Sequence, residues 1–314
     1  MQRKWAVGVL ALCGLIALAG CGGGGGGSTS GKKAYEDQVA DVLKKKKTPS
    51  ERAVALIKIA GEQGLEAKDS VGARKTLEQA FRQCSEIEDA QPRAAGFAAM
   101  AEVQAKLNFT TEAKNSAQKA RDAADKIDDA ETKAEALGRI GKALGALGEG
   151  DKAAETLKEA EGQIAKIADE KGRVLKLAAV AASYDAVNKV ADADRVLADA
   201  VALAHKMTDD GPRGVALGAV ALEQSRMKRT ADAAKTFTAA LEAARKSAEA
   251  RVAVNALIDI AEMLSKAGDA KQTHEVLKEA EKLCAKIEAP DAQKQGLDRA
   301  RDRMNKLPKP ASAG

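Results

Sequence analysis

The amino-acid sequence predicts an all-α solenoid of about six 40-residue helix-turn-helix repeats, with a capping helix at each end. Three observations predict this fold class. Apolar side chains recur at intervals of 40 residues, Gly or Asn recurs at one turn position, and the chain is rich in Ala, Glu, Lys, Leu and Arg. Aromatic residues make up only 2% of the chain, so we expect an aliphatic core, which suits closely packed helices better than sheets.

The chain begins with the pattern of a secretory signal peptide. Arg3 and Lys4 precede Ala6–Ala19, a stretch of 14 uncharged residues, whereas a membrane-spanning helix needs roughly 20. The stretch ends in Leu18-Ala19-Gly20-Cys21, which resembles the lipobox of bacterial lipoproteins. The resemblance implies that residues 1–20 are removed as a lipoprotein signal peptide and that Cys21 is lipidated. Acyl chains such as palmitate would then anchor the protein to a membrane.

The residues after Cys21 predict a flexible tether and then a short helix. Gly22–Gly27 are six consecutive glycines, so residues 21–33 cannot offset the entropy cost of ordering. In enterobacterial lipoproteins an Asp at the position of Gly22 retains the protein in the inner membrane, so the resemblance implies an outer-membrane location here. Residues 34–48 are expected to form an N-terminal capping helix, because Lys44–Lys47 fall in its last turn, where cations suit the helix dipole.

Two sets of apolar positions repeat every 40 residues along the body of the chain. Within each set the spacing is three or four residues, so each set marks one face of a helix, A or B. The B-helix position that begins at Ala80 is alanine in all six copies, and the A helix of the first copy is offset by one residue. We therefore expect six copies, at 49–90, 91–130, 131–170, 171–210, 211–250 and 251–290.

The turns and helix starts repeat as well. Positions 108, 148, 188, 228 and 268 are Asn, Gly, Asn, Lys and Gly, and Gly and Asn tolerate the left-handed conformation that ends many helices. An acidic residue precedes a basic one by four positions in four copies, which predicts a structural ladder, with an anion-binding stripe as the alternative. The acidic members are Asp89, Asp129, Asp169 and Asp209.

The third copy carries the residues of a known repeat. Its A helix has the order large, large, small, large, and its B helix has small, large, small, which resembles tetratricopeptide repeats. The resemblance covers about residues 49–307 and implies a right-handed superhelix. The period is 40 rather than 34, and the bulky aromatics usual on helix A are mostly absent, so a HEAT-like or other α-solenoid stays an alternative. The matching residues are Leu137, Ile140, Gly141 and Leu144 on helix A, and Ala153, Leu157 and Ala160 on helix B.

The C-terminal end predicts a second cap. Residues 291–307 continue the A-helix register, since Leu297 follows Leu257 at the repeat interval. Charged residues stud this helix, and a polar outer face is what a terminal repeat needs. Residues 308–314 are expected to be a disordered tail.

The resemblance to tetratricopeptide repeats also implies a binding surface. In that family the exposed face of helix A lines a concave groove, which would accept an apolar or helical segment of a partner. The alternative is that tight curvature closes the groove and that these residues simply pack. Carried onto this chain, the candidate groove consists of Ala98, Glu102, Gly138, Lys142, Ala178, Asp185, Gly218, Leu222, Ile258 and Glu262.

The sequence shows no constellation of catalytic or metal-ligating residues. His205 and His274 lie in different copies at different repeat positions, without partners at metal-ligand spacing. Cys84 and Cys284 are five copies apart, too far for a disulfide, and are expected to be small core residues. We therefore expect no enzyme activity, no cofactor and no metal.

Charge and composition favour a binding protein. The net charge is +5, or +3 without Arg3 and Lys4, which gives no case for nucleic acid as a partner. The leading interpretation is a membrane-anchored envelope lipoprotein that binds a protein or peptide partner and acts as an interaction scaffold. A small-molecule or glycan receptor and a structural spacer are the alternatives.

Overall fold

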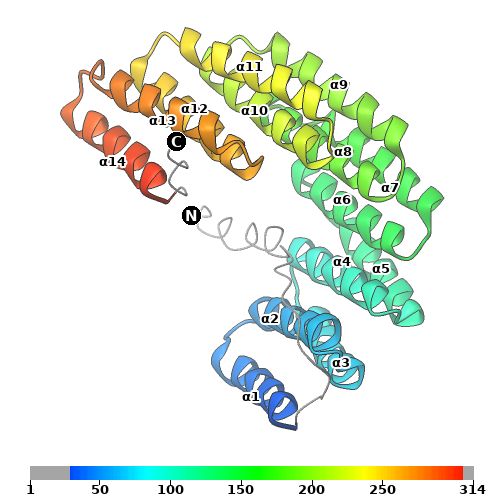
Figure 1. Cartoon of the computed structure of the whole chain (residues 1–314). Helices are drawn as coiled ribbons and strands as arrows, with labels where there is room; N and C mark the ends of the chain where they lie inside the picture. Colours follow the sequence, from blue (N-terminus) through cyan, green and yellow to red (C-terminus); the bar gives the residue numbers. More distant parts are fainter. Residues whose placement is uncertain (1–28, 307–314) are drawn as a thin grey trace.

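The structure is a computed structural model that describes the backbone of residues 29–306 and the side chains of residues 34–306. The predicted signal peptide (1–20), Cys21, the glycine run and the tail (308–314) lie outside the described residues. The described part is an all-α array that follows a broad arc (Figure 1) and contains no strand. Its elements are α1 (Thr29–Lys45), α2 (Pro49–Gly61), η2 (Glu62–Glu66), α3 (Ser70–Glu86), α4 (Ala90–Lys106), α5 (Thr110–Ala124), α6 (Ala130–Ala146), α7 (Gly150–Ile164), α8 (Glu170–Ala186), α9 (Val190–Lys206), α10 (Asp210–Arg226), α11 (Thr230–Lys246), α12 (Ala250–Lys266), α13 (Ala270–Cys284) and α14 (Pro290–Lys306).

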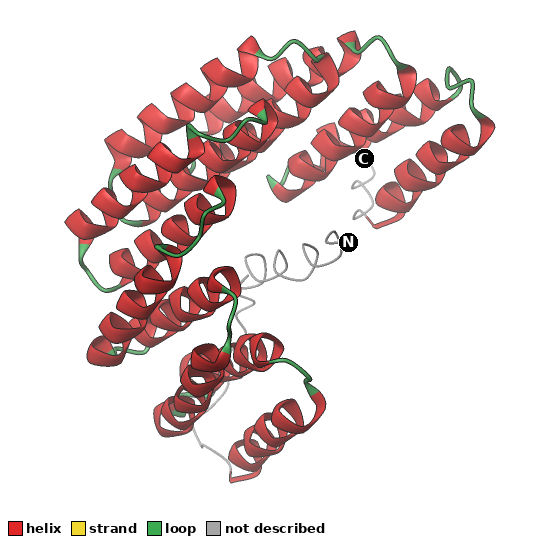
Figure 2. Ribbon diagram, turned by 180° about the vertical axis from the view of Figure 1, so that it is seen from behind, coloured by secondary structure: helices red, strands yellow, loops and turns green. Residues whose placement is uncertain are grey.

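The predicted solenoid of helix pairs is confirmed. The even-numbered helices α2–α12 are the A helices, and each packs most closely against the B helix that follows it. Successive A helices also pack on one another and lie on the inner side of the arc, while the B helices lie on its outer side (Figures 1 and 2). Each copy therefore buries its apolar face against both its own partner and the next copy, as helical repeats must.

The turn between the A and B helices is left-handed at every repeat. The backbone φ angle is positive at Asn108, Gly148, Asn188, Lys228 and Gly268, which are the five positions expected from the sequence. Lys68 has the same conformation in the first copy. A lysine in this conformation has a backbone strain energy that Gly and Asn largely avoid. The turn forms at the lysines all the same, so the repeated helix packing determines the turn conformation.

The one-residue offset of the first copy has a structural cause. Its A helix ends in the π-helical segment η2, where the amide of Ala67 bonds the carbonyl oxygen of Glu62 at 3.0 Å. A π-helical turn accommodates one additional residue without disturbing the helix on either side. The additional residue is therefore accommodated before the turn at Lys68. The residues of α3 then lie at the same repeat positions as those of the other B helices.

The acidic and basic residues at the A-helix starts have a structural role, but a different one from the predicted ladder. Asp129 caps α6 by accepting a bond from the Thr132 amide at 2.8 Å, and Asp169 caps α8 in the same way. In three of the four motifs the cation four residues later donates instead to a backbone carbonyl oxygen at the end of the preceding B helix. Arg213, for example, donates to the Met207 carbonyl oxygen at 3.0 Å, and Arg93 donates to that of Ile87. These three cations therefore join one copy to the next.

The N-terminal cap differs from the expected range. α1 begins at Thr29, so the last residues of the predicted tether (21–33) are helical, and the helix ends at Lys45 rather than at residue 48. A helix that is already nucleated extends by further residues at low cost, whereas Thr48 is needed as the N-cap of α2. At the other end α14 begins at Pro290, one residue before the expected start.

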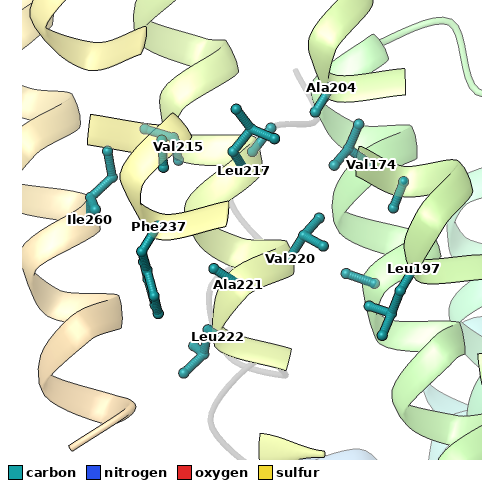
Figure 3. Close-up of a cluster of buried hydrophobic side chains, with 14 of the residues drawn as sticks. Val174, Leu197, Ala204, Val215, Leu217, Val220, Ala221, Leu222, Phe237 and Ile260 are labelled. Atoms are coloured by element: carbon teal, nitrogen blue, oxygen red, sulfur yellow. The ribbon is translucent and has the colours of Figure 1, made fainter. Parts of the chain in front are cut away.

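The core is built from the positions that recur in the sequence. The alanine series from Ala80 to Ala280 is fully buried in all six copies, and Leu157 is also fully buried. Figure 3 shows one section of this core, in which Leu217 of α10 lies between Leu197 of α9 and Ile260 of α12. Cys84 and Cys284 are buried free thiols, as expected, and burial raises the pKa of Cys84 to about 12.

The two buried cysteines are matched by two glycines on the next A helix. A Cβ added at Gly96 would lie 2.9 Å from the Cys84 Sγ atom, and one at Gly296 would lie 3.0 Å from that of Cys284. In the second copy the corresponding pair is Ala124 and Ala136, two buried alanines in place of one larger and one smaller residue. The Cys–Gly and Ala–Ala pairs therefore fill this contact with similar total volumes but different residues.

We predict that Leu157→Ala lowers the free energy of unfolding by roughly 2–5 kcal/mol, because it leaves a cavity in a site with no solvent access. Urea unfolding followed by circular dichroism measures the loss. Val190→Ala, at a position 51% exposed at the start of α9, is the matched control and should change stability by less than about 0.5 kcal/mol. Equal effects of the two substitutions would contradict the described core.

We predict that Gly96→Ala and Cys84→Ala are not additive. The added methyl group overpacks the contact with Cys84, which costs about 1–3 kcal/mol, but it fits once Cys84 is alanine, as in the Ala124–Ala136 pair. A double-mutant cycle of urea unfolding should give a coupling of at least about 1 kcal/mol. Additive effects would show that α3 and α4 do not meet at this point.

Candidate protein-binding surface

The exposed face of the A helices forms one continuous line along the inner side of the arc. It consists of two positions per helix that are 40 residues apart from copy to copy and that are mostly half-buried or exposed. We call this surface the concave strip. Its members are Ala95 and Ala99 on α4, Glu135 and Arg139 on α6, Leu175 and Ala179 on α8, Val215 and Ala219 on α10, Asn255 and Asp259 on α12, and Gln295 and Arg299 on α14.

Most of the candidate groove predicted from the sequence is wrong in register. Six of its ten residues are buried: Ala98, Gly138, Ala178, Gly218, Leu222 and Ile258. Gly218, for example, faces the next A helix, since a Cβ added there would lie 2.9 Å from Met263 Sδ and 3.2 Å from Ile260 on α12. The surface that is actually exposed lies one residue further along each helix.

The other four predicted residues are half-buried. Glu102, Lys142 and Glu262 lie one helical turn from the concave strip, at equivalent positions of α4, α6 and α12. Asp185 lies near the end of α8 and accepts a 2.6 Å hydrogen bond from Arg229, which joins it to the next copy. Three of the ten predicted residues, Glu102, Lys142 and Glu262, therefore lie along the exposed surface. A fourth, Asp185, joins two copies through its hydrogen bond.

A signal in the sequence distinguishes the two lines. The buried line is small or apolar in every copy from Ala98 to Ile258, because a neighbouring helix lies against it. The exposed line varies in polarity from copy to copy, reading Ala99, Arg139, Ala179, Ala219, Asp259 and Arg299. Variation in polarity between copies therefore marks the surface that water can reach.

The centre of the concave strip is apolar. Leu175 and Ala179 of α8 lie beside Val215 and Ala219 of α10, and Ala182 extends the patch along α8. Ala179 is the most exposed of these residues, while the others are half-buried or nearly buried. A contiguous apolar surface of this kind, rimmed by charges, is typical of a site that binds another protein.

Charged clusters flank this centre on both sides. On the N-terminal side Glu135 accepts bonds from Arg139 at 2.8 Å and from Lys176 at 3.1 Å. Burial opposes ionisation of Glu135, but the two cations outweigh it and hold the pKa of this carboxyl below its ordinary value. On the C-terminal side Arg299 pairs with Asp259, and Arg303 pairs with Glu262 at 2.8 Å.

The described residues contain no group of three or more His, Cys, Asp or Glu side chains that could hold a metal ion. Among the helices of residues 29–306, none is long and apolar enough to cross a bilayer. The concave strip offers an apolar surface for burial at its centre and charged groups for recognition at its two flanks.

No protein-family model matches the chain, and no curated protein is similar to it. Solved structures show a loose likeness. Ton1535 from Thermococcus onnurineus NA1 has a TM-score of 0.45 and 16% identity, with 86% of this chain and 96% of that chain covered. A Rap protein complexed with Competence and Sporulation Factor has a TM-score of 0.36 and 13% identity, with 88% and 81% covered. The Signal Transduction ATPase with Numerous Domains (STAND) protein with a tetratricopeptide repeat sensor, PH0952 from Pyrococcus horikoshii, has a TM-score of 0.33 and 16% identity, with 88% and 42% covered.

These low scores carry no inference about function. The fold is established by the chain's own helices, by the repeated left-handed turns and by the buried alanine series. The described residues form an all-α solenoid of repeated helix pairs.

Proposed function

We propose that this protein is a membrane-anchored envelope lipoprotein that acts as a protein–protein interaction scaffold, and that it binds a protein or peptide partner on the concave strip. The observation that carries the proposal is the apolar centre on α8 and α10, between two charged clusters. An apolar centre with a polar rim is the common anatomy of protein interfaces. The partner would lie across the A helices and contact several copies at once.

The sequence before the described residues supports the anchored location. The lipobox-like run that ends at Cys21 follows an uncharged stretch of signal-peptide length, and a run of glycines separates it from α1. A tether of about seven residues, between Cys21 and the start of α1 at Thr29, has a typical span of roughly 15 Å, so the solenoid would stay near the bilayer yet reorient freely. Gly22 favours the outer membrane as its location.

We predict that a photo-crosslinking amino acid at position 179 or 219 captures a protein partner in intact cells. Position 198, an exposed alanine of α9 on the outer side of the arc, is the matched control and should give no such adduct. Ala179→Glu, which places a charge at the apolar centre, should abolish the adduct formed from position 219, while Ala198→Glu should leave it. Adducts of equal yield at all three positions, or adducts from none, would exclude the concave strip as the interface.

We predict that Cys21→Ser releases the protein from the membrane fraction. Serine has no thiol to alkylate, so the chain would lose the acyl chains that hold it on the bilayer. Metabolic labelling with a palmitate analogue, followed by fractionation of the cells, measures both effects, with Cys84→Ala as the control that should keep label and location. Label retained in the Cys21→Ser variant would rule out lipidation at this residue.

A further inference from the structure

The outer seams between successive B helices are closed by ion pairs along most of the array. From α5 to α13 at least one arginine–carboxylate pair crosses each seam. Such pairs contribute little stability on an exposed surface, but they occupy the space between helices that diverge on the outside of an arc. The pairs are Arg121–Glu159 at 2.6 Å, Arg195–Glu161 at 2.9 Å, Arg229–Asp194 at 2.9 Å and Arg245–Glu279 at 2.8 Å.

The seam between α3 and α5 is different. Arg74 pairs with Glu112 at one end, but Phe81 occupies the position that Arg121 and Glu161 hold in the next two copies. A cavity of about 340 Å³ opens beside it, which is near the lower limit for a small-ligand site. The space suits a single side chain or a small molecule rather than a cofactor.

Aromatic side chains are concentrated at this one place. The chain has four phenylalanines, and three of them meet here. The rings of Phe81 and Phe97 pack edge to face with centroids 5.3 Å apart, and the Arg74 guanidinium lies 4.1 Å from the centre of the Phe109 ring. Phe81, Phe109 and Leu77 line the cavity and give it apolar walls.

The cavity also contains a polar group that lacks a partner. Gln104 lines it, is 5% exposed, and its Oε1 atom is buried without a hydrogen-bond donor. In the first copy the equivalent residue, Gln63, accepts a 2.7 Å bond from the Thr76 hydroxyl. In the second copy Ser116 stands in the place of Thr76, and its hydroxyl is also without a partner. A buried acceptor of this kind costs free energy until a donor reaches it.

The charges around the cavity favour neither an anionic nor a cationic ligand. Arg74 and Arg82 are balanced by Glu78 and Glu112, so the lining has no net charge. Three of the nine lining residues are apolar, two of them aromatic, and the unpartnered atom is an acceptor. The ligand that complements them is a neutral aromatic ring with one hydrogen-bond donor, which among protein side chains is best matched by tyrosine. A phenylalanine would fill the same walls but leave Gln104 unpaired.

We propose that the cavity between α3 and α5 is a docking site for a tyrosine side chain of a partner polypeptide. The ring packs among Leu77, Phe81 and Phe109, and the phenol O–H donates to Gln104 Oε1. The charged side chains at the rim face the backbone of the bound segment. The backbone amides can donate to the glutamates, and the backbone carbonyl oxygens can accept from the arginines. This site lies on the outer side of the arc and does not depend on the concave strip.

The test compares two capped tripeptides, acetyl-Gly-Tyr-Gly-amide and acetyl-Gly-Phe-Gly-amide, by saturation-transfer NMR on the full-length protein in detergent, with protein-free micelles as the blank. The Tyr peptide should receive saturation at its ring protons and bind about three- to tenfold more tightly than the Phe peptide, the range expected for one hydrogen bond. Equal binding of the two peptides, or no saturation transfer from the protein, would overturn the proposal. So would binding of p-cresol without binding of the Tyr peptide, because the ligand would then be a free phenol.

Three variants identify the site. Gln104→Leu, which copies Leu144 and Leu264 at the same repeat position, should fold and bind both peptides with the weaker affinity. Phe81→Arg, which copies Arg121, should fill the cavity and abolish binding of both. Ser116→Ala should leave the preference for Tyr unchanged, since its hydroxyl does not take part. A preference that survives Gln104→Leu, binding that survives Phe81→Arg, or a preference lost in Ser116→Ala would each contradict the assignment.

One further variant distinguishes peptide binding in the cavity from partner binding on the concave strip. Ala179→Glu should bind the Tyr peptide as the unsubstituted protein does, because α8 contributes nothing to the cavity. A loss of binding in this variant would show that the peptide lies on the concave strip instead.

Discussion

The close approach of the two helices in each copy is the constraint on which the rest of the structure depends. At the crossing between α6 and α7, a Cβ on Gly141 would lie 2.7 Å from the Leu157 side chain, and at that between α10 and α11 a Cβ on Gly214 would lie 2.7 Å from the Ala240 carbonyl oxygen. The alanine series that begins at Ala80 is fully buried for the same reason. Small residues bring the backbones together, and the larger aliphatic side chains then have a gap of fixed size to fill.

This packing determines which surfaces remain for binding. The A helices stack on one another along the inner side of the arc, so only a narrow line of each is exposed, and the neighbouring copies join these lines into the concave strip. The B helices diverge on the outer side, where long ion pairs bridge them. The array therefore offers two kinds of surface: a continuous inner strip that spans many copies, and separate outer seams that each belong to two copies.

Repetition also makes the exceptions informative. The π-helical segment η2 absorbs one extra residue in the first copy, and the Cys–Gly pairs replace Ala–Ala pairs at the first and last contacts of their kind. Phe81 stands at a position that is Arg121 and Glu161 in the next two copies, and a cavity lies beside it. In each case the fold is kept while one copy departs from the common pattern. Such local departures are where a repeat protein gains sites that its other copies lack.

The sequence by itself determined the helices, their pairing and most of the core, because the 40-residue recurrence reports burial directly: Ala80, Leu157 and their equivalents must avoid water in every copy. It also placed the left-handed turns, including the one at Lys228. Only the tertiary structure decided which line of each A helix is exposed. Neighbouring residues on a helix point about 100° apart, and the angle at which the next A helix docks selects between them. Ala98 and Ala99 are the same residue type, yet one is covered by the next helix and the other lines the surface.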